Sequence, residues 1–205
     1  MKNVITFLCL FCFVVSNCSI SAQDSIDNSE DYLKRSPIYD YTELQLSNTD
    51  TIPGFDSKSN KLKISGIIFE SDGITPAKDV ILYIDQADEN GDFDLRYNNE
   101  KRYVHNRGWI KTDSDGSYTF YTYVPGNDRR YNQMQQLFPI VKESSKAAYE
   151  LESFLFDDDP FLTKTCRKRL AKKGDPTRIL KLEIVDDMYV VQKNIVLNSN
   201  SDSTK

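Results

Sequence analysis

Residues that could carry out acid–base or metal chemistry are few, because the chain contains a single histidine, His105. His105 stands among tyrosine, asparagine and arginine in residues 102–107, where an imidazole could act as a base or as a metal ligand. A solvated or hydrogen-bonded side chain is the commoner state of a lone histidine, and it is the one we expect here. The count excludes any site that needs two histidines.

Two acidic motifs look like metal sites but are better explained by local structure. Residues 113–116 (DSDG) resemble the start of a calcium-binding loop, yet the glutamate that would complete such a loop is replaced by Val124. Asx-Gly between two strands is a common turn, which is what we expect at this place. Residues 157–159 are three aspartates ahead of Pro160, and we expect them to cap a helix and complement its dipole.

The elements that must position such residues are mostly strands. Apolar and polar residues alternate through much of the chain after residue 60, with the period of a half-buried strand. Strands are expected at residues 61–68, 80–84, 108–112, 117–123, 137–142, 151–156, 179–185 and 189–197. A helix is expected only at Pro160–Lys173, followed by Gly174. The pattern predicts an all-β, antiparallel β-sandwich with one short C-terminal helix and a final hairpin around residues 186–187.

The first 22 residues have the features of a signal peptide. Lys2 precedes an apolar run over residues 4–15, which is too short to span a bilayer, and Ala22 could be the last residue removed. Lipoprotein processing at Cys18 is the alternative. We therefore expect an exported protein, periplasmic or extracellular, or lipid-anchored if Cys18 is lipidated. No later apolar run could span a membrane.

Length and composition suit one domain with a core of its own. The chain has 205 residues, of which 39% are hydrophobic, with 12 tyrosines and 11 phenylalanines. Its net charge of -5 disfavours generic nucleic-acid binding, which needs a basic face. We expect a polar N-terminal arm over residues 23–60, the sandwich domain over 61–198 and a disordered tail over 199–205.

The order of motifs over residues 61–162 resembles the intradiol ring-cleavage dioxygenases, especially their small secreted bacterial members. The matching stretches are LKISGIIFESDGITPAKDVILYI, DENGDF, RGWIKTDSDGSYTFYTYVPG and FDDDPFLTK. The strand–turn–strand part also recurs in transthyretin-like sandwiches, whereas the whole series is more specific. The resemblance implies a β-sandwich and, in active members, a ferric ion held by two tyrosines and two histidines. That ion binds a catechol, whose ring is cut by oxygen between the two hydroxyl-bearing carbons.

The iron ligands that the resemblance implies are mostly missing from this chain. The family's tyrosine positions fall at Phe93 and Tyr131, and its His-x-His pair falls at Gln136 and Phe138. A phenylalanine keeps the ring but offers no donor atom, so we expect no bound metal and no cofactor. The resemblance therefore implies a degenerate, inactive member that acts as a binding or structural module.

Several alternatives remain open from the sequence. A retained pocket could take an aromatic small molecule. It would be lined by the residues at the family's ligand positions and by a second set of residues. That second set is Tyr103, His105, Arg107, Trp109 and Arg130. Another possibility is an active non-haem iron oxidoreductase whose rearranged site uses His105 with Tyr103 or Tyr131 and carboxylates. A secreted adhesion or carrier sandwich is a third. The lone Trp109 is expected to be a buried core anchor.

Overall fold

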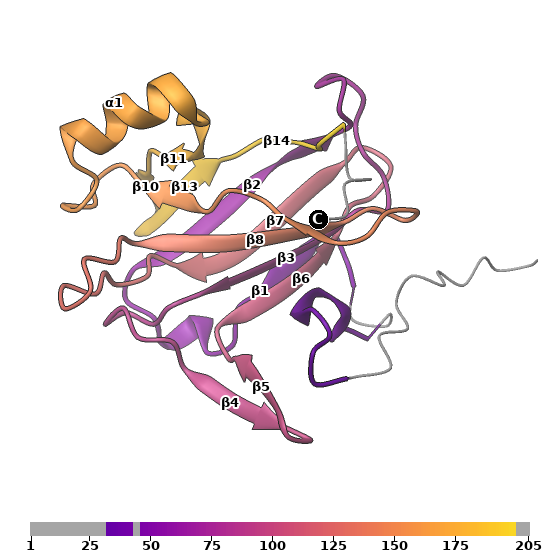
Figure 1. Cartoon of the computed structure of the whole chain (residues 1–205), viewed down its shortest axis with the longest axis horizontal. Coiled ribbons are helices and arrows are strands. Elements are labelled where there is room, and N and C mark those ends of the chain that lie inside the picture. The colour runs from indigo at the N-terminus through magenta and orange to yellow at the C-terminus, as the bar shows by residue number, and fades with distance from the viewer. Residues whose placement is uncertain (1–31, 43–45, 200–205) are drawn as a thin grey trace, which may run out of the picture.

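The computed structural model describes residues 32–42 and 46–199, which form two packed β-sheets (Figure 1). One sheet, here called the β2 sheet, has the order β1-β7-β2-β13-β12, with β14 also paired to β2. Its strands are β1 (Thr49–Thr51), β7 (Ser117–Tyr123), β2 (Lys61–Phe69), β13 (Met188–Gln192), β12 (Glu183–Val185) and β14 (Ile195–Val196).

The other sheet, here called the β3 sheet, has the order β11-β10-β8-β3-β6, with β9 paired to β8. Its strands are β11 (Ile179–Leu180), β10 (Phe154–Phe156), β8 (Gln136–Lys142), β3 (Ile81–Gln86), β6 (Arg107–Lys111) and β9 (Tyr149–Glu150). A separate hairpin, β4 (Leu95–Asn98) and β5 (Lys101–Val104), projects from the side away from the helix α1 (Lys164–Lys173) (Figure 1). Short 3-10 turns lie at Pro37–Tyr39, Phe55–Ser57 and Pro176–Arg178.

The core lies between the two sheets and follows from the alternating pattern. In β7, Tyr118 and Phe120 are buried, and in β2 so are Leu62 and Ile64. The β3 sheet contributes the opposing layer, including Leu82, Ile84, Leu137 and Val141. Burial of this many large apolar side chains is the main stabilising contribution to the fold.

The predicted all-β sandwich is confirmed, with one difference in strand direction. The central pairs β2–β7 and β3–β8 are antiparallel as expected, but β1 pairs with β7, β13 and β14 pair with β2, and β11 pairs with β10 in parallel. These are short strands from the two ends of the domain. Each pairs with the edge of an existing sheet, and its direction depends on how the chain returns to that edge.

The helix and the final hairpin are also found, with shifted boundaries. The helix begins at Lys164 rather than at Pro160, because the Thr163 hydroxyl oxygen caps it by accepting from the Cys166 N–H at 3.2 Å. The aspartate run 157–159 therefore does not supply the cap. The hairpin β12–β13 turns at residues 186–187, but the predicted strand 179–185 is divided between the two sheets.

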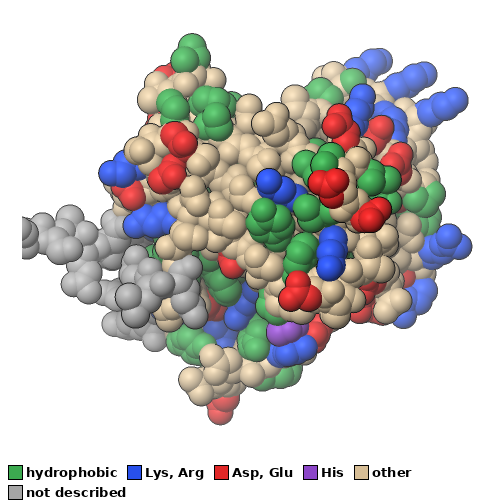
Figure 2. Space-filling model, turned by 180° about the vertical axis from the view of Figure 1, so that it is seen from behind, with side chains coloured by type: hydrophobic (Ala, Val, Ile, Leu, Met, Phe, Trp, Pro, Cys, Tyr) green, Lys and Arg blue, Asp and Glu red, His purple; other side chains and the backbone are tan. Residues whose placement is uncertain are grey.

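Basic side chains gather at the corner of the molecule where α1 lies (Figure 2). Among the described residues, no helix combines the length and the apolar character needed to cross a membrane.

The outer face of the β3 sheet is covered by residues that precede the sandwich in sequence. Ile38 is fully buried there against Ile81 and Tyr83. Trp109, expected to be a buried anchor, also lies on this face and is partly buried against the cluster of Ile81 and Tyr83 rather than between the two sheets; its indole N–H donates to the Pro37 carbonyl at 3.1 Å. Tryptophan suits this position because its ring packs on the sheet while its N–H still finds an acceptor. In the described part of the expected arm 23–60, Ile38 and Ile52 thus pack onto the sandwich. The predicted signal peptide, Cys18 and tail residues 200–205 lie outside the described residues.

Candidate functional site

The outer face of the β3 sheet brings together side chains from three neighbouring strands. Asp85 on β3 pairs directly with Phe138 on β8 and with Arg107 on β6. Two residues back, Tyr83 pairs with Ile140 on β8. Directly paired residues project from the same face, so these side chains form two adjacent rows.

Phe93 is brought over this face by a tight turn. The Asp88 carboxylate accepts hydrogen bonds from the backbone N–H groups of Asn90 and Asp92 at 2.8 and 3.0 Å. Gly91 takes a left-handed φ of 88° within the turn. Phe93 then packs on Phe138, with ring centroids 5.8 Å apart and an interplanar angle of 47°.

Gly91→Ala is expected to disturb this site. A Cβ at position 91 would lie 2.6 Å from the backbone carbonyl carbon of Asn127, and the left-handed conformation itself costs an alanine roughly 1–2 kcal/mol. We expect the free energy of unfolding, measured by urea denaturation, to fall by at least about that amount. Gly73→Ala is the matched control, because Gly73 has a φ of 71° but only a distant neighbour at 4.0 Å. Equal losses in the two variants would show that the contact with Asn127 contributes nothing.

A cavity of about 510 Å³ lies beside the two phenylalanines, and we call it the Asp85 cavity. Its walls are mostly apolar and come from β3, β8, the segment after β9, the hairpin β4–β5 and the chain before β1. The lining residues are Ser36, Pro37, Asp85, Phe93, Val104, Phe138, Pro139, Ile140, Glu150 and Leu151. A volume of this order suits a small organic molecule.

Asp85 is a partly buried ionisable group of this cavity. Burial, with a smaller contribution from the charge of Glu150, raises the pKa of Asp85 to about 6. The Tyr83 hydroxyl, which donates to Asp85 Oδ2 at 2.8 Å, and the nearby Arg107 both oppose that rise. The same burial, together with the Asp85 charge, raises the pKa of Tyr83 far above its usual value, so Tyr83 remains a hydrogen-bond donor.

The four positions that the resemblance assigns to iron ligands do not form a metal site. Phe93 and Phe138 line the cavity without a donor atom. Gln136 accepts a hydrogen bond from the Ser153 hydroxyl at 2.7 Å, and Tyr131 is 77% exposed. Nowhere in the described part of the chain do three or more His, Cys, Asp or Glu side chains gather to hold a metal ion. A ferric ion therefore does not fit the residues present.

The second predicted set lies outside the Asp85 cavity. The Arg107 guanidinium carbon sits 4.0 Å from the Tyr103 ring centroid and 4.8 Å from that of Trp109. Arg107 and Trp109 border a neighbouring cavity of about 410 Å³ instead. Arg130 forms ion pairs with Asp92 and Asp128.

His105 is half-buried beyond β5, outside both cavities. Burial and the charge of Arg96 lower its pKa, which favours the neutral imidazole.

Asp85 and Glu150 are the site residues that the sequence analysis missed. Asp85 follows directly on the apolar run 80–84, and a carboxylate in line with a buried strand is the signal that could have marked it. Glu150 reaches the cavity because β9 pairs with β8, placing Glu150 beside Ile140.

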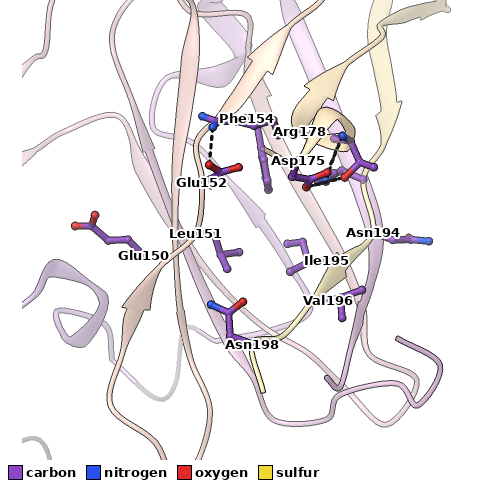
Figure 3. Close-up of a pocket in the computed structure, with 12 residues that line it drawn as sticks. Glu150, Leu151, Glu152, Phe154, Asp175, Arg178, Asn194, Ile195, Val196 and Asn198 are labelled. Atoms are coloured by element: carbon purple, nitrogen blue, oxygen red, sulfur yellow. Dashed lines mark hydrogen bonds and ion pairs between the residues drawn. The ribbon is translucent and has the colours of Figure 1, made fainter. Parts of the chain in front are cut away.

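A second cavity of about 520 Å³ lies between β14 and the chain that joins β9 to β10 (Figure 3). Its polar side chains bind one another. Arg178 pairs with Glu152 at 3.2 Å, and the Lys193 ammonium donates to the Thr177 carbonyl at 3.0 Å and lies 3.8 Å from Asp175. These contacts pair the charged side chains of this cavity with neighbouring groups, so we assign the charged side chains a structural role.

Solved structures similar to this chain share a single architecture. The dioxygenase domain of a dioxygenase–carbohydrate-binding protein fusion from Streptomyces sp. SirexAA-E has a TM-score of 0.55 at 20% identity, covering 75% of this chain and 88% of that chain. An intradiol ring-cleavage dioxygenase from Tetranychus urticae has a TM-score of 0.54 at 17% identity, covering 77% and 90%. This chain has the intradiol dioxygenase fold.

The resemblance noted in the sequence is thus confirmed by the fold. Catechol 1,2-dioxygenase from Pseudomonas arvilla C-1 also matches, with a TM-score of 0.58 at 13% identity, covering 78% of this chain and 60% of that chain. This chain therefore spans less than two thirds of the length of that enzyme. No protein-family model and no curated protein sequence matches the chain. The likeness concerns the fold, and activity depends on the site.

Proposed function

We propose that this protein is a small-molecule binding module on the intradiol dioxygenase fold and that it does not cleave aromatic rings. The observation that carries the proposal is the contact between Phe93 and Phe138. Two positions that the resemblance assigns to iron ligands are occupied there by packed phenyl rings. An aromatic pair of this kind stabilises an apolar wall and gives a ferric ion nothing to bind.

The ligand that this site favours is an aromatic or apolar small molecule. The walls of the Asp85 cavity offer two phenyl rings together with Val104, Ile140 and Leu151. Apolar walls with a few polar groups are the usual composition of small-molecule sites. The proposal includes export, on the strength of residues 1–22, to the periplasm or the outside of the cell, or to a membrane through a lipid on Cys18. Mass spectrometry of the mature N-terminus tests that part, and an intact Met1 would contradict it.

Phe138→Trp tests the binding function. The larger indole is expected to fill part of the Asp85 cavity and to weaken binding of the neutral probe 2-phenylethanol by at least about tenfold. We expect the natural protein to bind this probe with a Kd of about 1 mM or tighter, measured by NMR titration.

Ile184→Trp is the matched control, since Ile184 is 70% exposed on β12 in the other sheet. It should leave binding of the probe unchanged. The proposal is wrong if the natural protein does not bind the probe, or if Phe138→Trp binds it as well as the natural protein does. Stoichiometric iron with turnover of catechol would favour an oxidoreductase with a rearranged site instead.

A further inference from the structure

Building on the proposed binding function, we propose that the Asp85 cavity selects a cationic ligand, an organic amine whose ammonium group pairs with Asp85. The apolar or aromatic body of the amine would lie against Phe93 and Phe138.

The charges around the cavity are of one sign. Asp85 and Glu150 are the charged residues that line it, and no lysine or arginine is among the described lining residues. The nearest positive charge, Arg107, pairs directly with Asp85 across β3 and β6 and offsets part of its charge, while its guanidinium lies over the rings of Tyr103 and Trp109. Asp85 is partly buried and Glu150 is exposed, so the negative potential in the cavity comes mainly from Asp85, whose surroundings screen charge less than water does. This potential attracts cations and repels carboxylates and phosphates.

Asp85 also has hydrogen-bonding capacity left over. Its Oδ2 accepts from the Tyr83 hydroxyl, while no described residue donates a hydrogen bond to Oδ1. An ionised carboxylate can accept about four hydrogen bonds, and an ammonium group offers three donors together with the opposite charge. A ligand ammonium therefore supplies the hydrogen-bond donors and the opposite charge that this carboxylate lacks.

The aromatic walls fit the same kind of ligand. Phe93 and Phe138 line the cavity and meet at a tilt, with an angle of 47° between their ring planes. A phenyl face attracts a nearby cation, and a tilted pair can accept a third ring edge to face. An alcohol of the same shape would gain the apolar contacts but would bring no positive charge to Asp85.

Amine binding should depend on pH through Asp85. The titratable and charged groups that face it are Tyr83 on its own strand, Arg107 from β6 and Glu150 from β9, while β8 presents the uncharged Phe138. Because the pKa of Asp85 is about 6, lowering the pH from about 7.5 to about 5 protonates it and removes the counter-charge. We expect amine affinity to fall over this range and alcohol affinity to stay level.

Three probes with the same phenyl group test the proposal on the full chain. They are 2-phenylethylamine, 2-phenylethanol and phenylacetate, compared by calorimetric or NMR titration at pH of about 7.5. We expect the amine to bind at least about tenfold more tightly than the alcohol, and phenylacetate to bind most weakly. Asp85→Asn should lower the affinity for the amine to the affinity for the alcohol. Glu183→Gln, an exposed carboxylate on β12 in the other sheet, should keep the preference for the amine.

The outcomes separate this proposal from the function on which it rests. Equal binding of amine and alcohol, both weakened by Phe138→Trp, would overturn selection of a cation and leave the binding function standing. Failure of both probes to bind at millimolar concentration would overturn the two together. Tighter binding of phenylacetate, or an amine preference that survives in Asp85→Asn, would show that Asp85 is not the recognition group.

Discussion

Protein carrying Phe93→Tyr, Gln136→His and Phe138→His together is expected to bind ferric iron at about one ion per chain, whereas the natural protein is expected to bind none. Phe93 and Phe138 are already in contact, and Gln136 lies two residues from Phe138 on the same face of β8. The three changes therefore direct a phenol and two imidazoles toward one region. Tyr131, the remaining position that the resemblance assigns to a ligand, is exposed and would have to turn inward to be the fourth ligand. Iron content after gel filtration and the visible absorbance of a ferric tyrosinate measure the result.

Each single substitution should leave the protein colourless, because one donor in an apolar wall cannot hold the ion. Tyr131→Phe in the triple variant should remove the colour if that tyrosine completes the site. The reasoning fails if the natural protein retains about one iron per chain and cleaves catechol, with both lost in His105→Ala. That result would mean a working enzyme with a rearranged centre.

Much of the sandwich could be predicted because buried and less buried residues alternate in strands such as β7 and β8. In β7 every second residue is buried up to Thr122, and the turn before it carries Gly116 with a left-handed φ of 69°. Such a pattern is local, so it can be recognised without knowing the partner strand. The short strand β1 was beyond reach, because three residues carry too little pattern to show where they pair, and the predicted strand 189–197 is divided into β13 and β14.

The chain ahead of the sandwich was harder to interpret, because its buried anchors are widely spaced among polar residues. Ile38 and Ile52 are both nearly inaccessible to solvent, yet neither belongs to a periodic run. Their burial depends on what covers the β3 and β2 sheets, which is a property of the assembled fold. This also explains why Pro37, a wall of the Asp85 cavity, was not foreseen as a site residue.

The candidate site was predictable only where the resemblance gave positions. It led to Phe93 and Phe138, which the structure places together. It could not lead to Asp85, because the pairing of Asp85 with Phe138 depends on the register of β3 against β8. A shift of one residue would turn Asp85 into the core, so register determines whether this carboxylate has a functional position at all.

Asp85→Asn is expected to stabilise the folded protein at neutral pH and to change its stability little at pH of about 4. Burial raises the pKa of Asp85 from 3.8 to about 6, so the folded state holds the proton more tightly than the unfolded chain does. At acid pH the Asp85 carboxyl is protonated and uncharged, so its burial costs the folded state little. As the pH rises through about 4 to 6 the carboxyl ionises, and this contribution to stability is lost. A shift of about two pKa units corresponds to about 3 kcal/mol at most, and an uncharged amide avoids that penalty while it still accepts from Tyr83.

Urea denaturation of the natural protein and of Asp85→Asn at the two pH values measures the effect, because acid effects elsewhere cancel in the difference between them. Glu183→Gln should show no such pH-dependent difference. If Asp85→Asn is instead less stable at neutral pH, the Asp85–Arg107 attraction outweighs burial, and the carboxylate is there to stabilise the fold. If the expected result is found, the ligand-free protein retains an ionised Asp85 that lowers its stability, as binding sites often do. A bound amine should offset that cost, and 2-phenylethylamine should then raise stability more at neutral pH than at pH of about 5.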